Sequence, residues 1–189
     1  LSFVSCIAGD VVIEIGPGPG ALTEGLLQKG LSVVAIELDD DFASTLGRLQ
    51  SPATGFLHVF NEDVLAVSFL DIQKKYLPKN QTIHIVSNMP YHLTKEILQK
   101  IGKTCPHPFE AILMVQEEVA RKVTSLSPQS SLMTLELALF GSFSYLASIP
   151  KGCFFPKPKV DSALISYISH PPMIESSPML EQFIGCLSK

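Results

Sequence analysis

Five short apolar runs recur along the first 115 residues of this chain, and a stretch of helical composition follows each one. The runs cover residues 11–15, 33–37, 57–60, 83–86 and 109–115. Continuous apolar runs of this length are typical of strands that are buried on both faces of a parallel sheet. Strands that alternate with helices indicate a mostly parallel sheet with helices on both faces. The sequence therefore predicts an α/β fold.

Two further runs of strand composition, 142–149 and 162–168, flank a turn rich in Pro and Lys at 150–159. They could pair as an antiparallel hairpin, which brings the predicted sheet to seven strands. Helices are expected at 21–29, 40–49, 69–76, 93–101, 116–124 and 132–140. This layout resembles that of the Rossmann-like methyltransferases.

The composition excludes several classes of protein. The chain has 189 residues, of which 46% are hydrophobic and 17% charged, so it fits one packed domain. No apolar run approaches the roughly 18 residues of a membrane span, and residues 1–6 lack the pattern of a signal peptide. The four cysteines form no CxxC and the five histidines no HExxH. We therefore expect no disulfide framework, no metal site, and a reducing, cytoplasmic compartment.

The net charge of −4 argues mildly against a nucleic-acid partner, but the charge is unevenly distributed. Residues 1–94 hold five Lys or Arg and ten Asp or Glu, whereas residues 95–189 hold nine and eight. Within the second half, the segment 151–161 contains Lys151, Lys157 and Lys159, and its only acidic residue is Asp161. This stretch could contact phosphates, or its lysines could simply be solvated.

A glycine-rich turn follows the first predicted strand, in the pattern Glu14-x-Gly16-x-Gly18-x-Gly20. Glycine permits a positive φ and a close approach of the backbone to a ligand. Glu37 ends the second predicted strand, where a carboxylate could accept both ribose hydroxyls of an adenosyl group. The pair indicates an adenosine-containing cofactor and leaves NAD and S-adenosylmethionine open, although the GxGxG spacing leans away from dinucleotides. The plainer interpretation is a glycine turn beside a surface acid.

An acidic pair, Glu62 and Asp63, follows the third predicted strand. Asp63 could accept a hydrogen bond from the adenine amino group of the cofactor. Acids after strands are common and usually only solvated, so the value of Asp63 lies in its register with Gly16 and Glu37 at one edge of the sheet.

The tetrapeptide Asn88-Met89-Pro90-Tyr91 comes directly after the fourth predicted strand, where open α/β sheets bind their ligands. The Asn88 side-chain oxygen and the Pro90 carbonyl could each accept one hydrogen of an adenine amino group. That geometry would aim the nitrogen lone pair at an electrophile, with Tyr91 stacked on the base. The alternative is a simple turn, with Asn and Pro for turn chemistry and Tyr packed inward.

Together these motifs resemble the ribosomal RNA adenine dimethyltransferases, most closely the small-subunit branch. The segments that carry the resemblance occur in the family's order: 14–23 (EIGPGPGALT), 34–39 (VAIELD), 61–63 (NED), 88–91 (NMPY), 115–121 (VQEEVAR) and 154–163 (FFPKPKVDSA). The family usually has Leu where Met89 stands, at a position that faces the core.

The resemblance implies transfer of two methyl groups from S-adenosylmethionine to the N6 amino group of each of two adjacent adenines in small-subunit rRNA, within a pre-ribosomal particle. It implies cofactor contacts from Gly16, Glu37, Asp63 and Asn88, and we extend this set to Glu14, Gly18 and Gly20. It also implies that Asn88, Pro90 and Tyr91 hold the target base and that Phe154 stacks on its other side. We assign the neighbouring Phe155 to the core. We expect a monomer without membrane attachment.

Three features depart from the family pattern. A QNFL-like segment that helps to cover the cofactor is missing before residue 11, and the loop at 125–131 is short. Residues 1–169 are expected to form the methyltransferase domain. The third departure concerns the C-terminal helical domain with which the family grips RNA. Residues 170–189 are expected to form a linker and only the first helix of that domain, which is truncated here.

Three other functions remain to be weighed. A large-subunit rRNA methylase of the resistance type is disfavoured by the loop at 16–20 and by the stretch at 159–163. A non-catalytic RNA-binding or transcription-factor relative is disfavoured because Glu37 and Asn88 are both present. A nicotinamide dehydrogenase is disfavoured by the GxGxG spacing and by the tetrapeptide.

Overall fold

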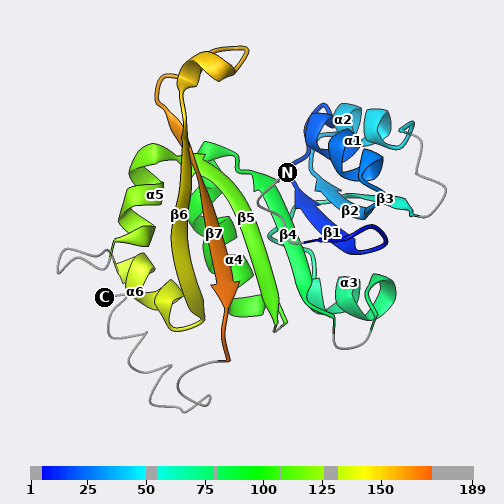
Figure 1. The fold of residues 1–189 in the computed structure, drawn as a ribbon. Coiled ribbons are helices and arrows are strands. Elements are labelled where there is room, and N and C mark those ends of the chain that lie inside the picture. Colours follow the sequence, from blue (N-terminus) through cyan, green and yellow to red (C-terminus); the bar gives the residue numbers. More distant parts are fainter. Residues whose placement is uncertain (1–5, 50–54, 79–80, 107, 126–131, 172–189) are drawn as a thin grey trace.

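Figure 1 shows the computed structural model, which describes residues 6–49, 55–78, 81–106, 108–125 and 132–171. A seven-stranded sheet has the order β3-β2-β1-β4-β5-β7-β6. Every pair is parallel except the two that β7 makes with β5 and β6. The strands are β1 (Val11–Ile15), β2 (Ser32–Glu37), β3 (Leu57–Asn61), β4 (Ile83–Asn88), β5 (Phe109–Gln116), β6 (Gly141–Ile149) and β7 (Ser162–Ser169).

The predicted architecture is confirmed, including the antiparallel hairpin of β6 and β7. The helices are α1 (Ala21–Gln28), α2 (Asp40–Leu46), α3 (Phe69–Tyr76), α4 (Thr94–Thr104), α5 (Glu117–Thr124) and α6 (Leu132–Ala138). A 3₁₀ turn at Tyr91–Leu93 precedes α4, which therefore begins one residue later than predicted and extends three residues further. The predicted linker and terminal helix, and most of the loop at 125–131, lie outside the described residues.

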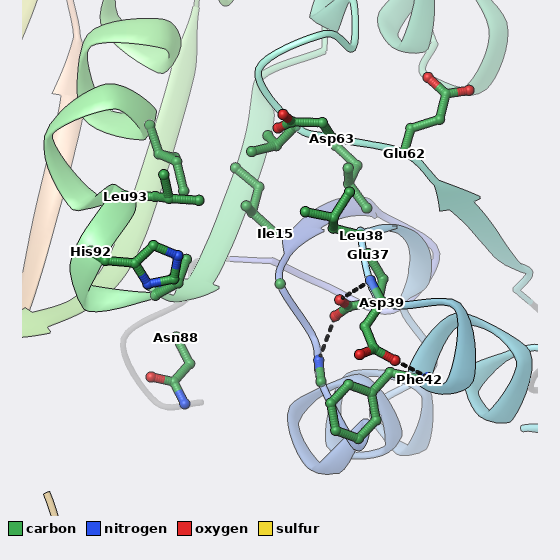
Figure 2. A pocket seen from close by; sticks show the side chains of 16 residues that line it. Ile15, Glu37, Leu38, Asp39, Phe42, Glu62, Asp63, Asn88, His92 and Leu93 are labelled. Carbon is green, nitrogen blue, oxygen red and sulfur yellow. Dashed lines mark hydrogen bonds between the residues drawn. The ribbon is translucent and has the colours of Figure 1, made fainter.

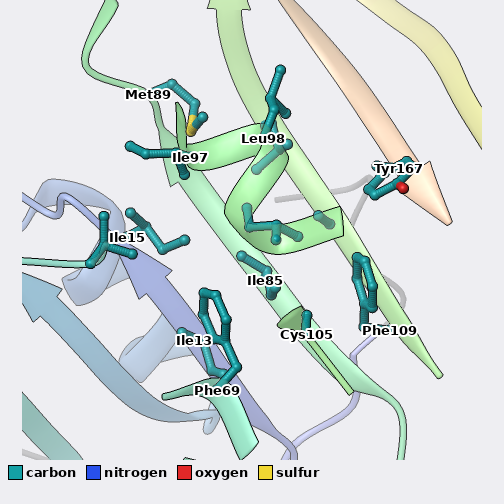
Figure 3. Close-up of a cluster of buried hydrophobic side chains, with 14 of the residues drawn as sticks. Ile13, Ile15, Phe69, Ile85, Met89, Ile97, Leu98, Cys105, Phe109 and Tyr167 are labelled. Carbon is teal, nitrogen blue, oxygen red and sulfur yellow. The ribbon is translucent and has the colours of Figure 1, made fainter. Parts of the chain in front are cut away.

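Alternate residues of the strands pack into two separate hydrophobic cores, one on each face of the sheet. Ile13 and Ile15 join a large cluster with α3, α4, α5 and α6, including Phe69, Ile97 and Leu98 (Figure 3). Their neighbour Val12 joins a smaller cluster with α1 on the opposite face. Because successive strand residues point to opposite faces, one continuous apolar run supplies both cores. None of the helices in the described residues is long and apolar enough to cross a membrane.

The far end of the larger core is built around Tyr167 of β7. Its ring is fully buried, stacks on Phe143 at a centroid distance of 4.2 Å and meets the edge of Phe109 at 5.5 Å. Its hydroxyl donates to the Leu137 carbonyl oxygen of α6 at 3.0 Å. The ring can lie there only because Gly141, at the start of β6, has no side chain. An added Cβ would lie 2.5 Å from the Tyr167 ring and 2.6 Å from the Ile168 carbonyl oxygen.

We therefore expect Gly141→Ala to destabilise the protein by about 1–3 kcal/mol, as overpacking of a core typically does. Gly152→Ala is the matched control, because no heavy atom lies within 4 Å of an added Cβ there. Its effect should stay within about 0.5 kcal/mol. Urea unfolding of both variants and the parent measures the difference. Equal midpoints for the two variants would contradict this packing of Tyr167.

Candidate active site

A pocket of about 490 Å³ opens at the carboxyl ends of β1, β2, β3 and β4 (Figure 2). Parallel pairing places these ends at one edge of the sheet, although they lie far apart in the sequence. The residues that line the pocket are Ile15, Gly16, Gly18, Ile36, Glu37, Leu38, Asp39, Phe42, Glu62, Asp63, Val64, Asn88, Pro90, His92, Leu93 and Ile97. Five residues predicted for the cofactor, Gly16, Gly18, Glu37, Asp63 and Asn88, are among them.

The glycine-rich turn forms one wall of this pocket. Gly16 and Gly18 have φ angles of 64° and 55°, in the left-handed region that favours glycine. The Gly16 N–H donates to the Ile36 carbonyl oxygen at 3.0 Å, which continues the parallel pairing of β1 and β2 into the first residue of the turn. Gly16 and Gly18, which line the pocket, therefore present backbone and no side chain to it.

The Glu37 carboxylate fastens this turn. Its Oε2 accepts from the Gly18 N–H and its Oε1 accepts from the Asp39 N–H, both at 2.9 Å, as Figure 2 shows. The residue is only 7% exposed, yet it lines the pocket. A carboxylate offers about four lone-pair positions, so two remain for hydroxyl groups of a ligand. Glu37 thus ties the turn to the end of β2 and keeps acceptor capacity at the pocket, unlike the surface acid of the plainer interpretation.

Glu14 and Gly20, which we also expected to bind cofactor, do not line the pocket. Glu14 turns inward beneath the glycine turn and is 1% exposed, and it accepts a hydrogen bond of 2.6 Å from the Thr23 hydroxyl. Gly20 faces the body of the protein, where an added Cβ would lie 2.7 Å from a Leu46 methyl group. Both residues support the turn from behind, which their spacing in the sequence could not show.

Burial raises the pKa of Glu14 to about 7, against the lowering effect of the Thr23 hydrogen bond and with a further rise from the charge of Glu37. The carboxyl group thus carries a proton at mildly acidic pH, where an exposed acid would be ionised.

Asp63 lies at the pocket side of the segment after β3. It is exposed, and its Oδ1 accepts from the Leu65 N–H at 2.8 Å. This bond fixes the carboxylate and leaves acceptor capacity for an amino group. The apolar residues Leu38, Val64 and Leu93 also line the pocket, which suits a flat heterocycle between them.

A second pocket, of about 340 Å³, lies beside the first. Its lining consists of Asn88, Met89, Pro90, Tyr91, Phe154, Phe155, Pro156 and Pro158. Asn88 and Pro90 line both pockets. The predicted tetrapeptide and the aromatic element of the β6–β7 connection therefore line one pocket. They must do so if Tyr91 and Phe154 are to stack on the same target base.

The aromatic residues of the second pocket differ in burial. Tyr91 and Phe154 are partly buried, and the Tyr91 hydroxyl is hydrogen-bonded to the Ser162 hydroxyl at 2.7 Å. Phe155 is fully exposed, with a relative exposure of 101%. Our assignment of Phe155 to the core is therefore wrong. It lies on the connection between β6 and β7, which projects beyond the rest of the sheet (Figure 1).

The Pro90 carbonyl, expected to accept from the target base, is already engaged. It accepts from the Leu93 N–H at 3.0 Å and from the Thr94 hydroxyl at 3.3 Å, where the chain turns into α4. The Thr94 hydroxyl has one hydrogen and also lies 3.3 Å from the Tyr91 carbonyl oxygen, so the Leu93 N–H is the donor that directs the Pro90 carbonyl into the helix. The Met89 N–H bonds to the Met114 carbonyl oxygen at 3.0 Å, whereas no hydrogen bond to the Met89 carbonyl oxygen is found within the described residues. Met89 is 2% exposed, as expected for a side chain that faces the core.

The β6–β7 connection is anchored to α5, through the predicted segment 115–121. The Glu117 N–H donates to the Asp161 carbonyl oxygen at 3.0 Å, and the Glu117 carboxylate accepts from the Tyr145 hydroxyl at 3.0 Å. Arg121 pairs with the same carboxylate at 2.6 Å. These contacts hold both limbs of the connection, so they help to place Phe154 over the second pocket.

Sequence reasoning missed several pocket residues, namely Leu38, Asp39, Phe42, Val64, His92, Leu93 and Ile97. Leu38 and Phe42 are apolar yet 62% and 41% exposed. An apolar side chain directly after the acid that ends β2 is the one signal that could have indicated a contact with a ligand.

Known proteins match this chain over most of its length. Residues 6–188 match the family model described as "Ribosomal RNA adenine dimethylase". The chain is 40% identical over 159 residues to the ribosomal RNA small subunit methyltransferase A of Protochlamydia amoebophila. This match covers 83% of the chain but 56% of that protein, so the chain spans little more than half of its relative.

Solved structures share the fold. The 23S rRNA methyltransferase ErmE matches with a TM-score of 0.73 and 26% identity, over 96% of this chain and 70% of that one. A dimethyladenosine transferase from Plasmodium falciparum matches with a TM-score of 0.68 and 25% identity, over 87% of this chain and 57% of that one. The fold is thus that of the Rossmann-like methyltransferases.

The raised pKa of Glu14 makes stability depend on pH. Because the native pKa lies above the unfolded value of 4.5, the unfolded state loses its proton first as the pH rises. Glu14 therefore favours the folded state most below pH 4.5. Its favourable effect declines between pH 4.5 and 7, and above that range the buried carboxylate lowers the free energy of unfolding by about 3 kcal/mol.

The variant Glu14→Gln keeps an acceptor for Thr23 and cannot ionise. Urea unfolding from pH 5 to 8 should show the variant gaining stability relative to the parent. A constant difference would contradict the buried, protonated state.

Proposed function

Because the chain belongs to the family of ribosomal RNA adenine dimethylases, we propose that it transfers methyl groups from S-adenosylmethionine to the N6 amino group of adenine in rRNA. The observation that carries the proposal is the meeting of two pockets at Asn88 and Pro90. One pocket has the acid and glycine backbone for an adenosyl group, and the other has the aromatic side chains for a base.

We assign the small subunit as the source of the RNA. Eight relatives named as ribosomal RNA small subunit methyltransferase A are 33–40% identical to the chain, whereas ErmE, a 23S rRNA methyltransferase, is 26% identical. In this proposal two adjacent adenines each receive two methyl groups, within a pre-ribosomal particle. The described cysteines are unpaired, which is compatible with a reducing compartment such as the cytoplasm.

The residues of the first pocket fit S-adenosylmethionine. The two remaining lone-pair positions of Glu37 suit the ribose hydroxyls, Asp63 suits the adenine amino group, and the turn at Gly16 and Gly18 leaves room for close approach. When bound, the cofactor supplies a methyl group activated on a sulfonium, with a thioether as leaving group. The protein has to supply position and hydrogen bonds.

The second pocket holds the acceptor. The amino nitrogen of adenine is a poor nucleophile, because its lone pair is delocalised into the ring. The Asn88 side-chain oxygen accepts one amino hydrogen, and the Met89 carbonyl oxygen replaces the occupied Pro90 carbonyl as the second acceptor. Both bonds leave the nitrogen lone pair directed toward the first pocket. Alignment of this kind supplies much of the rate enhancement in displacement reactions.

An adenine inside an RNA helix cannot reach this pocket while stacked, so it must be extruded. Tyr91 and Phe154 come from separate parts of the chain and line the same pocket, and they would hold the extruded ring between them. Around the pocket, Lys151, Lys157 and Lys159 are exposed and could neutralise phosphates. The exposed Phe155 ring offers a further stacking surface beside them.

The experiment that tests the function uses the full natural protein that contains this chain. Radiolabelled methyl groups should appear as N6,N6-dimethyladenine in immature small subunits and not in protein-free large-subunit rRNA. Labelling of the large-subunit RNA alone would favour a methylase of the resistance type. No labelling of either substrate, with cofactor bound, would favour a non-catalytic relative.

Glu37→Ala should weaken S-adenosylmethionine binding at least tenfold, because it removes the proposed acceptor for both ribose hydroxyls. A loss of this size corresponds to about 1.4 kcal/mol. It should also lower the melting temperature slightly, because the Gly18 and Asp39 N–H groups lose their partner. Calorimetry measures the affinity, with Glu24→Ala, an exposed acid on α1, as the control. Equal affinity of Glu37→Ala and the parent would place the adenosyl group elsewhere, as would stabilisation by NAD alone.

Asn88→Ala and Phe154→Ala should each lose most methyl-transfer activity while still binding cofactor. Stacking of a base on an aromatic ring is worth about 1–3 kcal/mol, so the loss of activity in Phe154→Ala should be at least fivefold.

Phe155→Ala should leave the melting temperature unchanged, because its ring makes no core contact. Methyl-transfer rates and melting curves of the three variants are the measurement. Activity near the parent level in Asn88→Ala would remove its proposed role, and a lower melting temperature in Phe155→Ala would contradict its exposure.

A further inference from the structure

A group of metal-ligand side chains lies at the other end of the sheet from the proposed active site. Cys6, Asp10 and His84 each direct a donor atom toward the others, and these sulfur, oxygen and nitrogen atoms all lie within 4.8 Å of one another. All three residues are partly buried. They are spread over 79 positions of the chain, so no local motif indicated them.

The sheet brings these residues together. Asp10 directly precedes β1, and His84 is the second residue of β4, paired in register with Val12 of β1. Cys6 packs against the smaller core on that same face of the sheet. On the other side of His84, its register partner Glu110 places a carboxylate oxygen 3.8 Å from the imidazole Nδ1. The cluster therefore rests on the rigid amino edge of two central strands.

The Asp10 carboxylate is held in place by neighbours. Its Oδ2 accepts from the Ile7 N–H at 2.9 Å, and its Oδ1 accepts from the Gln81 side-chain amide at 2.8 Å. Hydrogen bonds that orient a carboxylate in this way are typical of the surroundings of a metal site. Each oxygen keeps a lone pair for a cation.

A second, independent observation also indicates a ligand. The Gln81 side-chain oxygen is buried and has no hydrogen-bond partner within the described part of the chain. A buried acceptor without a donor destabilises the native state. Gln81 is joined to Asp10 through its amide nitrogen, so this oxygen lies beside the cluster. A water bound to a cation there would supply the missing donor.

The charge of the surroundings favours a cation. The Asp10 carboxylate belongs to the group, and the Glu110 carboxylate lies 3.8 Å from the His84 imidazole. A thiol, an imidazole and a carboxylate form the donor set that Zn²⁺ prefers among the common biological cations. Tetrahedral zinc would place its ligand atoms roughly 3.3–3.7 Å apart, so the donor atoms would move together by at most about 1 Å on binding.

We propose that Cys6, Asp10 and His84 form a zinc site, with water as the fourth ligand, that ties the segment before β1 to strand β4. On binding, the Cys6 thiol releases its proton to solvent and the thiolate sulfur bonds to the metal. The site stabilises the fold and lies away from the methyl-transfer pockets. The scattered cysteines and histidines led us to expect no metal site, and the three-dimensional arrangement is the reason to revise that expectation.

The test uses tag-free protein and the metal alone. Titration with Co²⁺ should give one equivalent of tetrahedral cobalt with a thiolate-to-cobalt absorption band in the near ultraviolet, and Zn²⁺ should displace it. Cys6→Ser should lose the band, and His84→Gln should bind at least tenfold more weakly. Cys153→Ser is the matched control, since Cys153 is an exposed cysteine on the distant β6–β7 connection, and it should behave as the parent does.

A second measurement avoids any failure of the variants to fold. In the unaltered protein, Zn²⁺ should protect Cys6 but not Cys153 from alkylation, as read by mass spectrometry of the peptides. Zn²⁺ should also raise the melting temperature of the parent and of Cys153→Ser. A parent without the cobalt band, a band that persists in Cys6→Ser, or equal alkylation of Cys6 with and without zinc would each overturn the proposal.

Discussion

The site depends on the parallel pairing of β1 with β2 on one side and with β4 on the other. This pairing places the glycine turn, Glu37 and Asn88 at one edge, although they are up to 72 positions apart in the sequence. The Glu37 carboxylate then ties the turn to the end of β2 through the Gly18 and Asp39 N–H groups. A single carboxylate thus shapes the pocket and is positioned to bind the ligand in it.

The position at which β4 ends determines which polar groups face the two pockets. Asn88 is the last residue of the strand and is exposed to both pockets, while the buried Met89 side chain fixes the backbone between them. Pro90 directs its carbonyl into the start of α4, so the geometry that begins the helix also decides which carbonyl can face a base. The antiparallel hairpin of β6 and β7 then brings Phe154 to the other side of that position. In the proposed function, binding of the cofactor and binding of the base are thereby coupled at Asn88.

The sequence predicted the sheet well because apolar runs such as 11–15 and 83–86 can be satisfied in few ways, and because glycine and proline marked their ends. It predicted the main pocket residues because parallel strand ends share an edge. It could not show that Glu14 turns beneath the glycine turn, that Phe155 projects outward while Phe154 packs inward, or that the Pro90 carbonyl is occupied. Those outcomes depend on side-chain direction and on hydrogen bonds between distant segments. The cluster of Cys6, Asp10 and His84 escaped notice for the same reason.

The central claim is that the adenosyl pocket and the base pocket meet at Asn88. Calorimetric titration of this chain with a bisubstrate compound tests it most directly, using an adenosine whose N6 nitrogen is joined by a short linker to the sulfonium position of S-adenosylmethionine. The account predicts that one molecule binds at least tenfold more tightly than the demethylated cofactor, and that Asn88→Ala removes this gain. Equal affinity for the two compounds would show that the pockets do not act as one site and would contradict the account.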